Sequence, residues 1–310
     1  MPSTITHTYI GLDTLEKLNT EPKSIISNHI NNYKIYCQNM DILYFYRIFL
    51  LFNNKVQTLG HQVHKENTLE LFKLLINDNK INKDPELFTF ISGLITHYKA
   101  DSLTHPYVNY LSLYGAKNTK FKDHFAIETF VDSYIVRERM NINHKKDNNS
   151  KEIFNFTEKK IIKEEIDKIF KELYNYPNMG KKYYRSLREM RFVFNHCRYD
   201  KFGAKMLFYK VIDLNPFKNL QRTKYLSYHF DLDNEDFLLN TNHNTWFNVD
   251  DNKITSNKSY LDLYNDAVNE SSTIINELYE HIYNNKKVDL DKIIGNYSYS
   301  NGLQLPKQGD

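Results

Sequence analysis

Cysteine is nearly absent from this chain. Cys37 and Cys197 are its only two cysteines, and they lie far apart in the sequence. A framework of disulfides is therefore excluded, and so is a zinc finger built from paired thiolates. Glycine and proline are also scarce, with nine and seven residues in a chain of 310. Because these two residue types interrupt helices, their scarcity favours a helical protein.

Long hydrophobic runs are missing as well. The most apolar stretch, residues 42–52, is interrupted by Arg47, and it is far shorter than the roughly 20 residues of a membrane-spanning helix. The first residues contain no basic lead followed by an apolar run, as a secretory signal would, so we expect a cytoplasmic protein. The formal net charge of +3 is small for this length and argues against a protein that mainly coats nucleic acid.

Apolar residues recur mostly at helical spacing, which predicts an all-α fold, a bundle of many helices. The helices are predicted at residues 10–18, 23–37, 42–52, 68–77, 85–104, 120–140, 158–174, 181–212 and 260–285. Strand patterns are weak throughout, and residues 215–259 are predicted to form a long loop packed against the helices.

A group of metal-binding residue types is spaced as a single helix face would require. His97, Asp101 and His105 follow one another at four-residue steps, and apolar residues precede them at helical intervals. His124 and Glu128 repeat the arrangement on a second predicted helix. Burying such carboxylates without partners would cost several kcal/mol each, and a bound cation removes that cost. Imidazole and carboxylate ligands without thiolate suit a catalytic Zn²⁺, and also Mn²⁺ or Fe²⁺.

Further candidate ligands lie upstream. They are His7, Asp41 and the pair His61 and His64, all predicted to lie outside helix interiors. Each of them alone would be explained more simply as a hydrogen-bonded core residue. The chain contains no His-Glu-x-x-His motif, which argues against the metalloproteases that use it.

Five segments of the chain resemble, in the same order, the motifs of the zinc-dependent phospholipase C family, which is related in fold to the fungal single-strand nucleases. The segments are Thr6-His7-Thr8-Tyr9-Ile10-Gly11, Asn39-Met40-Asp41-Ile42-Leu43, His64-Lys65-Glu66-Asn67-Thr68, Gly93-Leu94-Ile95-Thr96-His97 through His105-Pro106-Tyr107, and His124-Phe125-Ala126-Ile127-Glu128. The resemblance covers roughly residues 1–135. It implies a helical bundle with up to three zinc ions at one end of a cleft.

The resemblance also implies ligands for each ion. The first zinc would be held by two histidines and two carboxylates, which are Asp41, His64, His97 and Asp101, with His61 as the alternative to His64. Asp101 would bridge to another zinc that is also held by His7. The remaining ion would be held by His105, His124 and Glu128. The family also uses the amine of its mature N-terminal residue, which would be Pro2 after removal of Met1.

The implied reaction is hydrolysis of a phosphoester. Clustered zinc ions lower the pKa of bound water from about 15.7 to about 7, which provides a metal-activated hydroxide near neutral pH. By resemblance, Asp41 would orient or deprotonate this water, with Glu128 as the competing catalytic candidate. The substrate would be a phosphoester, such as a phospholipid. A nuclease or nucleotide phosphatase on the same scaffold and a non-catalytic helical protein stabilised by metal are the alternatives.

Nine basic residues lie between Lys181 and Lys210, interleaved with aromatic residues. Such a stretch suits an anionic membrane surface or single-stranded nucleic acid, although a solvated helix face with inward aromatics is the simpler interpretation. The sequence predicts one continuous domain. It would consist of a metal-binding helical core at 1–140, a polar linker or loop at 141–155, and further helices with a long loop at 156–310 packed on that core.

Overall fold

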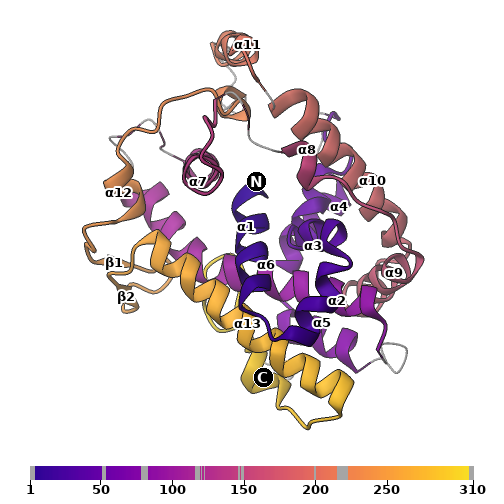
Figure 1. Ribbon diagram of the computed structural model, residues 1–310. Coiled ribbons are helices and arrows are strands. Elements are labelled where there is room, and N and C mark those ends of the chain that lie inside the picture. Colours follow the sequence, from indigo (N-terminus) through magenta and orange to yellow (C-terminus); the bar gives the residue numbers. More distant parts are fainter. Residues whose placement is uncertain are drawn as a thin grey trace.

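The computed structural model describes residues 4–50, 54–77, 83–115, 119, 121, 123–145, 147, 150–198, 200–214 and 223–306. Helices make up most of these residues (Figure 1). The two short strands found there, β1 (Trp246–Phe247) and β2 (Thr255–Ser256), form an antiparallel pair with Trp246 opposite Ser256. The predicted all-α fold class is confirmed.

The helical elements follow one another along the chain, and η marks a 3₁₀ or π turn. They are α1 (Thr4–Lys17), α2 (Thr20–Ser27), α3 (Ile30–Tyr36), η1 (Asn39–Phe45), α4 (Lys55–Val63), α5 (Thr68–Ile76), α6 (Pro85–Tyr110), η3 (Leu111–Gly115), α7 (His124–Met140), α8 (Ser150–Ile153), α9 (Lys160–Tyr174), α10 (Met179–Phe192), η5 (Val193–Arg198), α11 (Ala204–Ile212), η7 (Thr223–Leu226), α12 (Glu235–Leu239), α13 (Tyr260–Asn284) and α14 (Leu290–Ile294).

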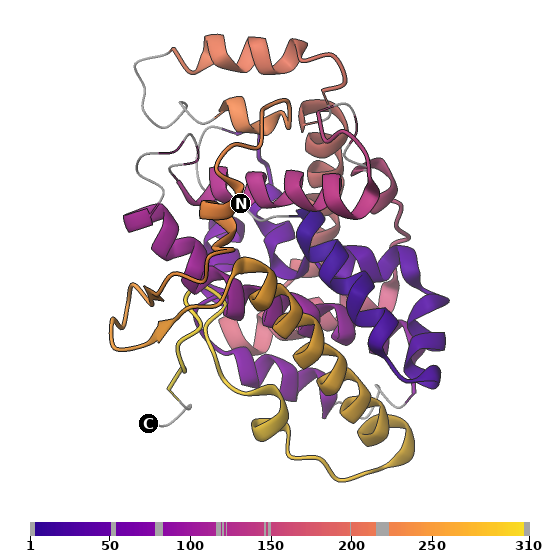
Figure 2. The same ribbon diagram turned by 60° about the vertical axis from the view of Figure 1, so that its left-hand side comes forward.

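Helix α6 lies at the centre of the bundle and spans 26 residues. It begins where the Asp84 side chain accepts a hydrogen bond from the Leu87 N–H, with Pro85 in the first turn, as is typical of helix starts. Helices α13, α3 and α1 pack against it (Figure 2). Side chains are buried on all sides of α6, which is expected of a helix at the middle of a fold. Polar residues on this helix therefore lie deep in the protein.

A glycine allows the close approach of α3 and α6. A Cβ atom added at Gly93 would lie 2.7 Å from the carbonyl carbon of Tyr36, a distance that real Cβ atoms do not tolerate. The close approach brings the end of α3 beside the middle of α6. As a result, the carbonyl oxygen of Cys37 lies 3.0 Å from the Nδ1 atom of His97.

Two helix predictions near the N-terminus were wrong in ways that matter for the site. His7 was expected outside a helix, but α1 begins at Thr4 and His7 lies within it. His61 was also expected outside helix interiors but lies in α4, whereas His64 is the C-cap residue of that helix. The start of α4 is fixed by a capping box in which Asn54 and Gln57 bind each other's backbone.

Other predicted helices are shorter than expected or divided. The segment predicted as one helix at 23–37 forms α2 and α3. In the described residues 42–50 of the helix predicted at 42–52, only η1 is present, and Arg47 adopts a positive φ of 53° after it. The segment 181–212 forms α10, η5 and α11, with Gly203 at a φ of 74° before α11. Arg47 follows the end of η1 and Gly203 is the N-cap residue of α11, and nothing in the apolar periodicity marks these left-handed positions.

The region 215–259 was predicted as a loop, but it contains η7, α12 and the β1–β2 pair. Trp246 anchors this region, since its side chain is buried and its Nε1–H donates to the Lys258 carbonyl. In the described part of the chain, every helix is too short or too polar to cross a lipid bilayer.

Candidate metal centre

Helix α6 supplies three of the predicted ligands, and four other elements supply the rest. His97, Asp101 and His105 lie one helical turn apart on α6 and share a face. The remaining ligands with described positions are His7 in α1, Asp41 in η1, His64 at the end of α4, and His124 and Glu128 in the first turns of α7. Pro2, the proposed N-terminal ligand, lies outside the described residues.

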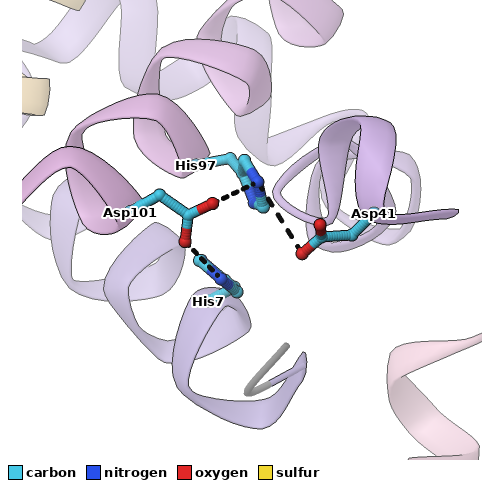
Figure 3. A group of neighbouring side chains, drawn as sticks. All are labelled: His7, Asp41, His97 and Asp101. Atoms are coloured by element: carbon cyan, nitrogen blue, oxygen red, sulfur yellow. Dashed lines mark ion pairs between the residues drawn. The ribbon is translucent and has the colours of Figure 1, made fainter. Parts of the chain in front are cut away.

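The first cluster consists of His7, Asp41, His97 and Asp101 (Figure 3). One ligand atom of each lies within 4.8 Å of those of the others. The two oxygens of Asp101 point to different histidines: Oδ1 lies 3.2 Å from His7 Nε2, and Oδ2 lies 3.0 Å from His97 Nε2. All four residues are buried, with at most 3% of each exposed.

His64 joins this cluster from the end of α4. Its Nε2 atom lies 3.0 Å from Asp41 Oδ1 and 3.8 Å from Asp101 Oδ2. His61 is not part of either cluster of metal-binding side chains in the described chain, and its ring lies 4.5 Å from the ring of Tyr44. The structure therefore brings His64, and not His61, to the carboxylates.

The second cluster consists of His105, His124 and Glu128. Glu128 Oε1 lies 2.9 Å from His124 Nε2 and 3.3 Å from His105 Nε2. His105 Nε2 also lies 3.6 Å from Asp101 Oδ1. Asp101 is thus the residue that links the two clusters.

The geometry of both clusters fits zinc. Zinc lies about 2.0–2.1 Å from a histidine nitrogen, so two ligand atoms of a tetrahedral ion are roughly 3.3 Å apart. The nitrogen–oxygen pairs above span 2.9–3.8 Å. Both oxygens of Asp101 and the Nε2 atoms of His64 and His97 are buried without a hydrogen-bond partner among the described residues. Burying polar atoms without hydrogen-bond partners destabilises the folded protein. A cation bound between them would remove this destabilisation.

The other ring nitrogens of four histidines are held by oxygen acceptors. Each Nδ1 donates its hydrogen to a different acceptor, which fixes the tautomer and turns Nε2 toward the cluster. The Nδ1 contacts are His97 with Cys37 O at 3.0 Å, His64 with Gly60 O at 2.6 Å, His105 with Tyr299 O at 2.6 Å, and His124 with Asn109 Oδ1 at 3.1 Å.

These supporting residues were missed in the sequence, because three of the four acceptors are backbone carbonyls that any residue carries. The C-terminal segment 296–305 was also missed. Within it, the Tyr299 N–H donates to the His64 carbonyl at 3.0 Å, while the Tyr299 carbonyl accepts from His105. This segment therefore contacts one ligand of each cluster, His64 and His105. The sequence does not indicate these contacts, because the segment lies far from both ligands along the chain.

The charges of the clusters shift the pKa values of their members. Burial alone would raise the pKa of Asp101, but His105, His97 and His7 hold that pKa well below its ordinary value. Burial alone would lower the pKa of His105, whereas Asp101 and Glu128 raise it to about 10. The pKa of His97 is lowered, chiefly by burial. Without metal, the site thus favours ionised Asp101 beside protonated His105.

A cavity of about 950 Å³ opens onto both clusters. Its walls include Asp41 and His64 from the first cluster and all three members of the second, together with segment 298–305. Apolar walls come from Ile48 and Leu303. Residues of both clusters therefore lie in the wall of a cavity that is large enough for a molecule much larger than water.

Comparison with known proteins identifies the family. The sequence profile described as zinc dependent phospholipase C matches residues 6–179, which is more than half of the 310-residue chain. The chain belongs to the zinc-dependent phospholipase C family. Comparisons with curated proteins and with solved structures gave no match. The match to this family of zinc-dependent hydrolases includes every ligand described above and excludes segment 296–305.

Proposed function

We propose that this protein is a zinc-dependent phosphoric ester hydrolase that cleaves a phosphodiester in the manner of a phospholipase C. One observation carries the proposal: the Nε2 atoms of the clustered histidines and the oxygens of three carboxylates converge where a cavity of about 950 Å³ opens. Family membership supports a hydrolase. The substrate and the number of ions are part of the proposal.

The residues divide between up to three ions. Asp41, His64 and His97 would hold one ion together with Asp101, and Asp101 would share a second ion with His7. The second cluster would hold the third. Two ions that share a carboxylate suit an in-line displacement at phosphorus, because both the attacking and the leaving oxygen need stabilisation.

When bound, zinc lowers the pKa of a coordinated water to about 7 and stabilises negative charge on the phosphoryl group. Asp41 is proposed to orient the attacking water or to accept its proton. Its side chain lines the cavity, and its Oδ2 atom has no hydrogen-bond partner among the described residues. Glu128, which also lines the cavity, is the competing candidate for this role.

The open cavity favours catalysis over a purely structural metal site. Structural zinc sites are closed by their four protein ligands, whereas catalytic sites keep a position open to water or substrate. Here Asp41, His105 and Glu128 all face the cavity. A protein that used the ions for stability alone would gain nothing from this access.

Two matched histidine variants test the site. His64→Gln removes a proposed ligand, while His61→Gln changes a neighbouring histidine that lines the same cavity outside both clusters. We expect His64→Gln to lose zinc and most phosphodiesterase activity, and His61→Gln to keep both. Asp41→Asn should retain most of its zinc and lose turnover. Equal effects of the two histidine variants would refute the ligand assignment.

A substrate panel tests the reaction. The zinc-loaded protein would be given phosphatidylcholine micelles, bis-(p-nitrophenyl) phosphate, single-stranded DNA and a nucleoside monophosphate. Release of diacylglycerol and phosphocholine from the micelles is the expected result. Activity restricted to DNA would indicate a nuclease, and activity restricted to the nucleotide would indicate a phosphatase. If the fully zinc-loaded protein hydrolysed none of these substrates, the proposal that it is an enzyme would be refuted.

A further inference from the structure

Helix α11 exposes its apolar side to solvent. None of its residues is buried, and in both views it lies at the edge of the molecule, beyond α7 and α10 (Figures 1 and 2). The apolar residues of this helix and its two ends form what we term the α11 patch: Phe202, Leu207, Phe208, Val211 and Leu214. Their side chains are between 61% and 85% exposed. Large apolar groups gathered on one surface indicate an interaction site.

The patch is one continuous face. Leu207, Val211 and Leu214 follow each other at steps of four and three residues, and Phe208 lies beside Val211, so these side chains are neighbours on the helix. The opposite face is attached to the protein. There, the Tyr209 hydroxyl donates to the Cys197 carbonyl at 2.9 Å, and the Met206 N–H donates to Asp200 at 2.8 Å. The helix is therefore held with its apolar face outward.

Lysines border the patch. Lys210 lies on one side of the apolar face and Lys205 on the other, and Lys201 precedes the helix. Lys201 and Lys210 are exposed. An apolar face bordered by lysines is the pattern of a helix that lies in the interface of an anionic membrane, with its apolar side among the acyl chains and its lysines at the head groups.

The exposed apolar surface also reaches the rim of the cavity. Phe49 and Phe192 are exposed, and their rings lie 5.6 Å apart edge to face. The Phe192 ring lies 4.7 Å from that of His196, whose carbonyl accepts a hydrogen bond from Lys205. Ile48, the neighbour of Phe49, lines the cavity. Exposed aromatic side chains therefore continue from the neighbourhood of α11 to the residue beside Ile48.

We propose that α11 anchors the protein to an anionic lipid bilayer. This inference rests on the patch and its lysines and not on the reaction proposed above. A symmetric dimer fits less well, because in a two-fold interface the same patch meets itself and brings its lysines together. An anionic bilayer instead offers the opposite charge along the whole length of the helix.

Co-sedimentation with vesicles tests the anchor. The full-length protein would be mixed at low salt with vesicles of phosphatidylcholine containing phosphatidylglycerol, or with vesicles of phosphatidylcholine alone. We expect binding to the anionic vesicles that weakens as salt screens the lysines. Replacing Leu207 and Phe208 together by glutamate should reduce partitioning more than about 100-fold, since both side chains lose their place in the acyl region.

Two further variants provide the controls. Leu113→Glu with Ile254→Glu makes the same chemical change at two exposed residues outside α11 and should bind as the wild type does. Lys201→Gln with Lys210→Gln should weaken binding to anionic vesicles about 25-fold, or about fivefold for each lysine. Thermal unfolding of each variant verifies that it is folded.

Three results would overturn the proposal. The wild type could fail to sediment with anionic vesicles, or the Leu207→Glu/Phe208→Glu variant could bind them as tightly as the wild type. Finally, the wild type could be a dimer in solution and bind no vesicles, while the Leu207→Glu/Phe208→Glu variant is a monomer. That last result would assign the α11 patch to a second copy of the chain.

Discussion

The substitution Asp101→Asn tests whether the two clusters form one metal centre that shares Asp101 or two independent metal sites. The carboxylate lies 3.2 Å from His7 and 3.6 Å from His105 through Oδ1, and 3.0 Å from His97 through Oδ2. Asparagine keeps the shape of the side chain but offers a single oxygen and no charge. We therefore expect the variant to lose zinc from the first cluster and to bind it more weakly in the second.

The size of the effect follows from charge and burial. Two unit charges about 4 Å apart interact by about 4 kcal/mol at an effective dielectric constant of about 20, so a dication would lose roughly twice that. In the metal-free protein Asp101 already interacts with protonated histidine, whose proton zinc must displace, so part of this loss is offset. A net loss of about 3–4 kcal/mol remains, which corresponds to a weakening of zinc binding by about 100-fold to 1,000-fold.

Zinc binding would be measured by competition with a chromophoric chelator. The matched control is Asp132→Asn. Asp132 is an equally buried carboxylate, but its oxygens accept hydrogen bonds from Thr6 and Tyr228 and belong to neither cluster. The control should keep its zinc, although it loses some stability. Zinc affinity of Asp101→Asn within threefold of the wild type would refute the role of Asp101 as the shared ligand.

Three other outcomes are expected. Removing zinc with a chelator should lower the melting temperature by several degrees, because each ion present at 1,000 times its dissociation constant stabilises the fold by about 4 kcal/mol; an unchanged melting temperature would contradict this. His105, whose pKa is raised to about 10 against the effect of burial, carries a proton at pH 7 in the metal-free protein. Zinc binding must displace that proton, so binding heats at pH 7 should vary with the ionisation enthalpy of the buffer, and zinc affinity should fall as the pH is lowered; buffer-independent heats would contradict this. Gly93→Ala should destabilise the fold by about 1–3 kcal/mol, since the new Cβ would force α3 away from α6, and a denaturant midpoint equal to that of the wild type would contradict this.

The sequence predicted the ligands that share a helix better than those that come from separate elements. His97, Asp101 and His105 share a face because helical spacing alone requires it, and His124 with Glu128 follows the same rule. No such rule connects His7, Asp41 and His64 with them, since these three come from separate elements. Only the family resemblance brought them into the predicted site.

The remaining features depend on contacts between distant parts of the chain. The carbonyls of Cys37 and Tyr299 that orient His97 and His105 leave no pattern in the sequence. The same holds for the division of predicted helices, because positive φ values at Arg47 and Gly203 do not disturb apolar periodicity. The outward apolar face of α11 was not predicted either, since periodicity shows that a helix is amphipathic but not which face is buried.

The central claim is that the two clusters of histidines and carboxylates bind zinc. Elemental analysis of the protein, purified without metal affinity resin and dialysed against zinc-free buffer, tests it most directly. We expect the wild type to contain more than one zinc ion per chain, and added zinc to restore any that dialysis removes. The Asp101→Asn variant should contain less zinc. A wild-type protein that holds no zinc even after incubation with the metal and gel filtration would contradict the claim.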